Sequence, residues 1–175
     1  MNWYDSVFTL IDLRSFSNLW FWIVLALMWS SLSHHVLGVP FDMVIRARRQ
    51  GGQAMADLEA LVAIQVRRRM NILRASGVWI TAFWAAVLSA MSLLGFRYNL
   101  EFAQALTLLG VPATLVFALG FRLASRLETQ PASDEALTRL LTWHRLKVQL
   151  IGLLAVMITA FWGMFHNLSI SVISR

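Results

Sequence analysis

Four histidines are the residues whose chemistry is easiest to foresee in this chain. His34 and His35 follow one apolar stretch, His144 precedes another, and His166 lies near the end of that second stretch. A haem inside a helical bundle needs two axial ligands at one depth on facing helices. Pairing His34 or His35 with His144 would meet this requirement, but the spacing does not demand it. Histidine at a membrane boundary is more often a polar interface residue, so we expect no cofactor other than bound lipid.

Arginines form the second chemically distinctive group. Six of them lie in two clusters: Arg46, Arg48, Arg49, Arg67, Arg68 and Arg69. Clustered guanidinium groups can contact anionic lipid headgroups or an acidic partner. The preference of cytoplasmic loops for positive charge also produces such clusters. We assign the six arginines to lipid or partner contact, and the formal net charge of +6 then requires no nucleic acid.

The remaining polar residues form no catalytic pattern. The chain has no cysteine, and its nine Asp and Glu residues are scattered, without Ser-His or metal-ligand spacing. A pathway for ions or protons usually needs ionisable groups at mid-membrane. Glu101 lies only at the edge of an apolar stretch, and Gln104, Thr81 and Thr159 are the other inward candidates. We therefore expect a protein that is not an enzyme and has no catalytic or metal site.

The composition places these residues in a membrane protein. Hydrophobic residues make up 58% of the chain and charged residues 14%, whereas a soluble domain carries about 25% charge. The charges are concentrated between four apolar stretches, each long enough to cross a bilayer core of roughly 30 Å. The predicted transmembrane helices cover residues 19–39, 75–96, 100–121 and 148–168.

A repeated sequence relates the second and fourth of these helices. Residues 57–84 and 135–162 both end in Ile-Thr-Ala-Phe-Trp, and a shift of 78 residues superimposes them. The same shift places Lys147 on Arg69, so basic residues precede both copies at one distance. Agreement in register over both features predicts an internal duplication of a helical hairpin.

The predicted fold is therefore all-α, a single membrane domain of four transmembrane helices built from two parallel-repeat hairpins. The hairpins cover residues 19–96 and 97–175. A short amphipathic helix within residues 1–18 is expected to lie in the membrane interface.

Glycine and proline mark the expected breaks in these helices. Gly51 and Gly52 separate a short helix from a longer one in the first polar segment. Residues 97–99 are expected to form a tight turn, and residues 131–134 to precede the last helix. Pro112 predicts a kink in the third transmembrane helix, because proline removes a backbone hydrogen bond.

Small side chains line two of the predicted transmembrane helices. They are Ala82, Ala86 and Ala90 on one helix and Gly152, Thr159, Ala160 and Gly163 on the other. Small residues let helices approach closely where the hydrophobic effect does not drive association. We predict helix packing through these residues, with Ala82 facing Ala160 because the two copies lie at matching depth.

The charge distribution predicts the orientation in the membrane. Twelve of the fifteen Lys and Arg residues lie in the loops 40–74 and 122–147, so both loops are expected in the cytoplasm. Both termini are then periplasmic, and the chain is a multi-pass protein of the bacterial inner membrane.

A resemblance to a known family is carried by the stretches NWYDSVFTLIDLRSFSNLWFWIVLALMWS, HHVLGVPFDMVIRARRQ, EFAQA and WHRL. These resemble a family of small bacterial inner-membrane proteins often described as "component of SufBCD complex". The resemblance covers most of the chain and implies a four-helix membrane protein, but its motifs specify no reaction. Iron–sulfur clusters are held by thiolates, and a chain without cysteine could at most tether such a machine to the membrane.

These observations favour a non-enzymatic accessory, scaffold or assembly subunit that associates with a larger inner-membrane complex or with itself. The aromatic-rich helices and the basic loops would be its contact surfaces. A small oligomeric channel or transporter is the first alternative. A haem- or quinone-binding membrane protein is the second.

Overall fold

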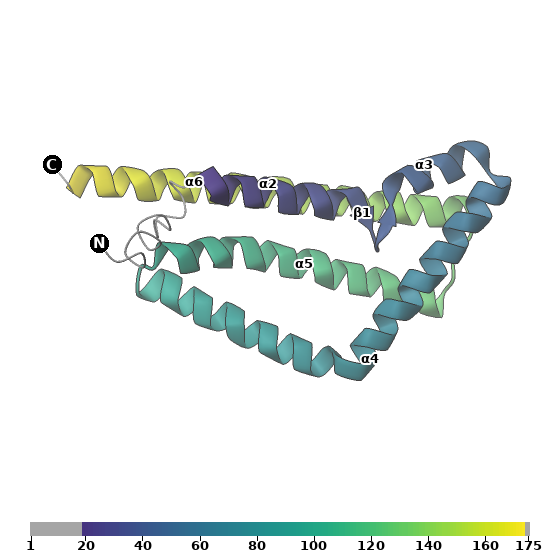
Figure 1. Ribbon diagram of the computed structural model, residues 1–175, viewed down its shortest axis with the longest axis horizontal. Coiled ribbons are helices and arrows are strands. Elements are labelled where there is room, and N and C mark those ends of the chain that lie inside the picture. The colour runs from purple at the N-terminus through teal and green to yellow at the C-terminus, as the bar shows by residue number, and fades with distance from the viewer. Residues whose placement is uncertain (1–18, 174–175) are drawn as a thin grey trace, which may run out of the picture.

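The computed structural model describes residues 19–173, which are almost entirely helical (Figure 1). In chain order the elements are α2 (Leu19–His34), β1 (His35–Val36), β2 (Val39–Pro40), α3 (Phe41–Gln50), α4 (Gly52–Arg97), α5 (Glu101–Thr129) and α6 (Asp134–Ile173). The all-helical prediction is confirmed, apart from the short antiparallel pair β1–β2. The interfacial helix predicted within residues 1–18 lies outside the described residues.

Three of the described helices are long and apolar enough to cross a membrane: α4, α5 and α6. The helix α2 is shorter than the predicted 19–39, because it ends at His34. Leu37 (φ 56°) and Gly38 (φ 84°) then adopt left-handed backbone, which closes the tight turn between β1 and β2. The 16 residues of α2 extend about 24 Å, less than the roughly 20 residues that a span usually needs.

The predicted break at Gly51 and Gly52 is confirmed. Both residues have positive φ, 61° and 48°, and Gly51 donates its N–H to the carbonyl of Ala47 at 2.9 Å. Because only glycine adopts the Gly51 backbone (ψ −152°) without strain, the chain ends α3 here and starts α4 in a new direction.

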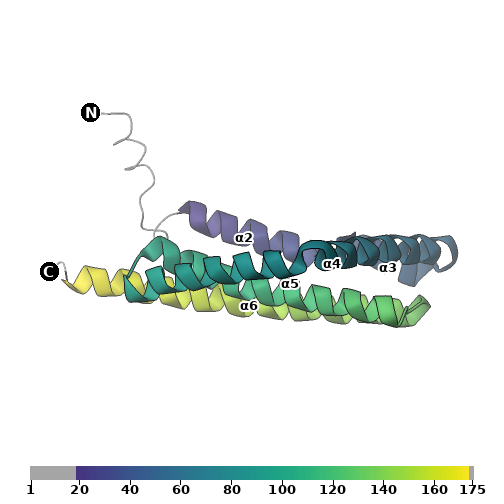
Figure 2. The same cartoon turned by 90° about the horizontal axis from the view of Figure 1, so that it is seen from below.

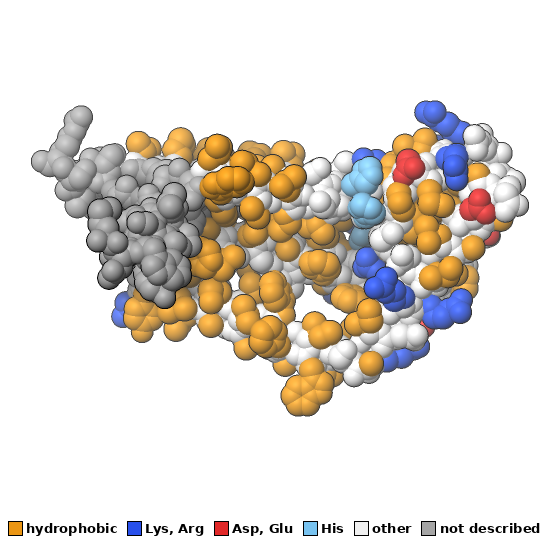
Figure 3. All heavy atoms as spheres, in the orientation of Figure 1, with side chains coloured by type: hydrophobic (Ala, Val, Ile, Leu, Met, Phe, Trp, Pro, Cys, Tyr) orange, Lys and Arg blue, Asp and Glu red, His pale blue; other side chains and the backbone are white. Residues whose placement is uncertain are grey.

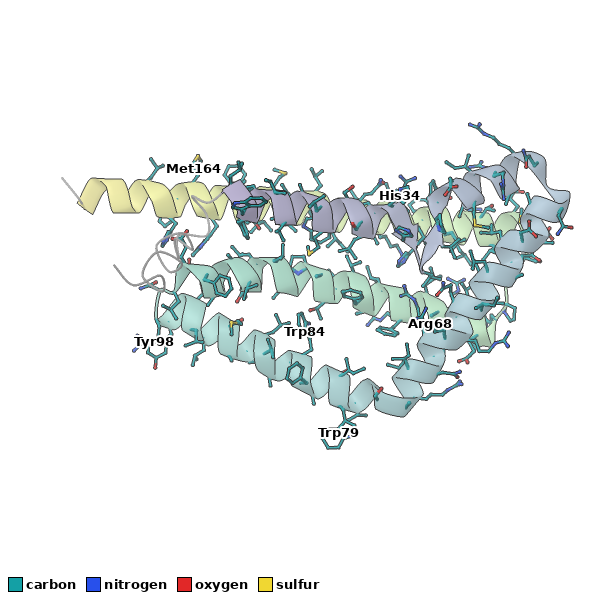
Figure 4. The ribbon with its side chains drawn as sticks, in the orientation of Figure 1. His34, Arg68, Trp79, Trp84, Tyr98 and Met164 are labelled. Atoms are coloured by element: carbon teal, nitrogen blue, oxygen red, sulfur yellow. The ribbon has the colours of Figure 1, made fainter. Side chains whose placement is uncertain are left out.

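The helix α4 continues from the basic segment into the apolar one without interruption, but it bends sharply near its middle (Figure 1). Ser76 and Gly77 lie at the bend, just before Trp79, which projects from its outer side (Figure 4). The Ser76 hydroxyl donates to the carbonyl of Ile72 at 3.3 Å. Serine back-bonding and Gly/Ser pairs are recognised causes of helix bending. The helix α5 continues through Pro112 as one helix, and the kink predicted at this proline stays a prediction.

The connections between the long helices are short. Residues 98–100 join α4 to α5, with Asn99 in the left-handed region at φ 55°, as the predicted tight turn requires. Residues 130–133 join α5 to α6. The predicted loops 40–74 and 122–147 are therefore mostly helical, because α4, α5 and α6 extend well beyond their apolar segments.

The molecule has two regions of different character. We call residues 35–74 and 122–147 the head, and residues 19–34, 75–121 and 148–173 the stem. Hydrophobic side chains cover the stem in Figure 3, whereas most charged side chains gather on the head. Figure 2 shows the long helices extended along one axis from head to stem.

Each region has its own core. The head core consists of Val36, Leu37, Val39, Val44, Ala47, Leu58, Val62, Val66, Met70, Leu123, Ala124, Leu127, Leu137 and Leu141. The stem core consists of Leu25, Trp29, Val116, Val148 and Ala155. No residue of α4 belongs to the described stem core, because α2 packs on α6 while the apolar half of α4 packs mainly along α5. Phe96 near the end of α4 also contacts the Trp162 ring of α6, with centroids 5.4 Å apart.

Candidate functional site

The histidines proposed as haem ligands differ in exposure. The rings of His34 and His35 lie edge to face with their centroids 5.0 Å apart, and both residues are exposed beside β1. His144 is instead buried on α6. Within residues 19–173, no group of three or more His, Asp or Glu side chains could hold a metal ion.

The six clustered arginines differ in exposure. The three on α3, Arg46, Arg48 and Arg49, are exposed, as are Arg67 and Arg68 on α4. Arg69 is half-buried, because its position on α4 faces the other helices. Three successive arginines point in three directions around a helix. Two of them can therefore meet lipid or a partner directly, while the third belongs to the interior of the head.

Arg69, His144 and Lys147 form a basic junction where α4, α5 and α6 meet at the base of the head. A Cβ placed on Gly120 of α5 would lie 3.1 Å from an Nη atom of Arg69, so the guanidinium rests against the α5 backbone. Burial lowers the pKa of His144, and the charges of Arg69 and Lys147 lower it further. Burial also lowers the pKa of Arg69, but an arginine remains protonated at neutral pH.

Arg145 lies beside this junction and faces the other way. Its guanidinium carbon is 3.9 Å from the centroid of the Phe41 ring, a cation–π contact between α6 and α3. Its Nε is buried and has no hydrogen-bond partner among the described residues. The head therefore contains a buried N–H group with unused capacity for an acceptor.

Two polar contacts hold the outer part of the head together. Arg74 on α4 pairs with Glu128 on α5 at 2.9 Å. Glu59 accepts the backbone N–H of Asp134 at 2.8 Å. A carboxylate at a helix N-terminus satisfies a free N–H and complements the helix dipole. The start of α6 is thus capped by a side chain from α4.

The small residues predicted for helix packing fall into two environments. Gly152, Thr159 and Gly163 on α6 are buried, and a Cβ on Gly152 would lie 2.8 Å from the Trp29 ring of α2. Ala82, Ala86 and Ala90 on α4 are exposed, as is Ala160 on α6. Since α5 lies between α4 and α6 in Figure 1, Ala82 and Ala160 do not face each other within the chain.

The tryptophans that close the two repeats both hydrogen-bond to α5. Trp84 on α4 points toward α5 (Figure 4) and donates to the hydroxyl of Thr114 at 2.7 Å. Trp162 on α6 donates to the side-chain oxygen of Gln104 at 3.0 Å. Gln104 is buried and also donates to the carbonyl of Gly95 at 2.9 Å, so it joins three helices. Sequence reasoning identified Gln104 as an inward residue but not these tryptophan contacts, which depend on the position of α5.

An apolar cavity of about 480 Å³ opens between α4 and α5 in the stem. Its lining is mostly aromatic and aliphatic: Ile80, Thr81, Phe83, Trp84, Thr114, Phe117, Ala118 and Phe121. The cavity lies on the stem side of the bend in α4, where the ribbons of α4 and α5 are far apart (Figure 1). Beyond it the two helices are in close contact, since a Cβ on Gly110 would lie 2.7 Å from the Leu88 side chain. The size falls within the roughly 300–1,000 Å³ that is typical of small-molecule sites.

Comparison with known proteins adds no family to this description. No protein-family model matches the chain, and neither a curated protein nor a solved structure is similar to it.

Proposed function

We propose that this chain is a four-span protein of the bacterial inner membrane that acts as a non-enzymatic accessory, scaffold or assembly subunit. The head lies in the cytoplasm in this proposal, and both termini are periplasmic. Three long apolar helices support a membrane location, and the concentration of basic residues in the head supports its cytoplasmic side. The fourth span in this proposal is α2, and the β1–β2 turn that follows it belongs to the head.

One observation carries the accessory role. All nine residues from Val78 to Ala86 on α4 are exposed, so two and a half turns of a stem helix lack a neighbour on most sides. Val78 is 81% exposed, Trp79 79% and Phe83 70%. Ala82 and Ala86 lie one turn apart in this segment, which suits close packing of a second helix against them. We infer that a transmembrane helix of a partner protein, or of a second copy, covers this segment.

Co-purification in mild detergent tests this role. We expect the tagged full-length chain to retain a membrane partner, and the double substitution Ala82→Leu with Ala86→Leu to release it, because larger side chains hold the helices apart. The matched control is Leu153→Ala with Leu154→Ala on the exposed face of α6. If the native chain is monomeric and no protein accompanies it, or if both variants release the partner equally, the accessory role fails.

The orientation has a separate test. A reporter that is active only in the cytoplasm should function when inserted at Gly51 or Ala132, and should be inactive at Asn99 or after Arg175. The first two positions lie in the head and Asn99 lies at the opposite end of the stem. Activity at Asn99 would contradict the proposed topology.

The cavity between α4 and α5 favours quinone binding as a second candidate function. The aromatic walls suit a flat ring, and Thr81 and Thr114 supply hydroxyl groups near it. Addition of ubiquinone to the purified protein should quench the contribution of Trp84 to the fluorescence of the eight tryptophans, and Trp84→Phe is the control that removes this contribution. Saturable quenching that persists in Trp84→Phe at full amplitude would place the quinone elsewhere.

A further inference from the structure

The basic junction is unusual because its charges lack partners. The ion pairs among the described residues are Arg74 with Glu128 and His166 with Glu101. No described carboxylate therefore lies within 4.0 Å of Arg69, Arg145 or Lys147. By contrast, the more exposed Arg74 does have a partner. Leaving the half-buried charge of Arg69 unpaired is unfavourable unless a ligand compensates it, whereas Lys147 is exposed and available to such a ligand.

The geometry around Arg69 limits the ligand that could compensate these charges. Its guanidinium is held against the α5 backbone at Gly120, whereas His144 and Lys147 approach from α6. Arginine offers a planar fork of N–H donors that matches phosphate oxygens, and lysine adds a compact point charge. Histidine contributes a further N–H from the buried side.

The depth of the junction is also informative. Arg69 and Lys147 precede the apolar segments of α4 and α6, which start at residues 75 and 148. Charged headgroups lie at this level of a bilayer, and basic pockets between transmembrane helices on the cytoplasmic side bind anionic headgroups.

We propose that Arg69, His144 and Lys147 bind a phosphate group at the junction of α4, α5 and α6. The phosphate can come from an anionic phospholipid or from a soluble phosphate anion, because both present the same oxygens. The site does not require the accessory role, since it lies in the head and away from the exposed segment of α4.

Native mass spectrometry of the delipidated full-length protein tests the site. The probes are phosphatidylglycerol, phosphatidylcholine and inorganic phosphate. We expect retention of phosphatidylglycerol, or of inorganic phosphate, in preference to phosphatidylcholine. Substituting Arg69→Gln with Lys147→Gln should weaken binding by about fivefold for each charge removed.

The matched control is Arg67→Gln with Arg68→Gln, which removes the same charge from exposed positions of α4. If both double variants weaken anion binding equally, the weakening reflects the net charge of the protein and not a specific site, and the proposal is overturned. Preference for phosphatidylglycerol over inorganic phosphate identifies the lipid as the source, and the reverse preference identifies the soluble anion. Absence of selective retention for either anion overturns the proposal.

A second measurement uses the unmodified protein and so does not depend on the folding of variants. The imidazole of His144 can be titrated by NMR with and without the preferred probe. A bound phosphate offsets the charges of Arg69 and Lys147, so its presence should shift the titration of His144 to higher pH. An unchanged titration at saturating probe would show that the anion binds elsewhere. If no protein partner is retained in detergent but the shift in the His144 titration is still seen, the accessory role is disproved and the phosphate site is supported.

Discussion

The helices α4 and α6 contain the two related segments, 57–84 and 135–162, and the structure gives them different shapes. The segment in α6 is straight and has a buried face, whereas the segment in α4 bends and exposes its Ile-Thr-Ala-Phe-Trp sequence on most sides (Figure 1). Ser76 and Gly77 at the bend correspond to Leu154 and Ala155 in α6. Among the many positions at which the two segments differ, we attribute the bend to these two, because Gly/Ser pairs are a recognised cause of helix bending.

Exchange of these two residues is expected to have the largest effect. Ser76→Leu with Gly77→Ala removes the serine back-bond and the glycine, so α4 should straighten. Spin labels at Asp57 and Leu93, both exposed on α4, would report the change by electron resonance. Their separation should approach the roughly 54 Å of a straight helix. An unchanged distance would mean that packing against α5, and not the Ser-Gly pair, imposes the bend.

The two threonines of the repeated sequence should respond unequally to a larger side chain. Thr159 is 1% exposed and donates to the carbonyl of Ala155, whereas Thr81 is exposed. Thr159→Leu should destabilise the protein by about 1–3 kcal/mol through overpacking. Thr81→Leu should stay within about 0.5 kcal/mol of the native protein. Thermal unfolding in detergent measures both, and similar losses would show that the Thr81 face is also packed.

The two tryptophan hydrogen bonds give a smaller contrast. Trp162→Phe leaves the buried oxygen of Gln104 without its donor, which costs about 1–3 kcal/mol. Trp84→Phe removes a more exposed bond to Thr114, which contributes about 0.5–1.5 kcal/mol. Chemical denaturation in detergent should rank Trp162→Phe as the less stable. The reverse ranking would imply that α4, and not α6, anchors α5.

The head supplies the smallest expected effect. His144 corresponds in register to Val66, and both are buried. Because the pKa of His144 is lowered in the folded protein by burial and by Arg69 and Lys147, the unfolded chain binds its proton first as pH falls. Stability should therefore decline as pH drops below the ordinary histidine pKa of about 6.5. The His144→Val variant should lose this part of the pH dependence of stability. Unfolding curves at pH 7.5 and 5.5 would measure the loss. If the variant keeps the same change of stability with pH, another group is responsible for that change.

Much of the fold follows from patterns along the chain, because helix breaks are local. The joint at Gly51 and Gly52, the turn at Asn99 and the link before Asp134 all depend on residues within a few positions. The end of α2 was placed too late, since the turn at Leu37 and Gly38 interrupts a stretch that is apolar throughout. Hydrophobicity cannot distinguish a membrane helix from a buried hairpin when both need the same side chains.

The candidate site was less predictable, because it depends on which helices become neighbours. Arg67, Arg68 and Arg69 are identical in type, and only the packing of α4 on α5 separates the inward one from the outward two. His144 was considered as a haem ligand with His34 or His35, yet its surroundings are basic residues from α4 and its own helix. The unpacked state of residues 78–86 results from the Ser-Gly bend, whose effect on packing could not be derived from composition.

The head core also has a consequence for biosynthesis. It joins Val36 near the start of the described chain to Leu141 in α6, so it cannot close until the ribosome has made most of the protein. If the head is cytoplasmic, as we propose, the apolar stripe of α4, which includes Leu58 and Val62, stays open to the cytosol until then. Incompletely assembled chains with exposed apolar surface are prone to aggregate. A nascent chain paused before Leu137 should therefore recruit chaperones, and one extended past α6 should release them.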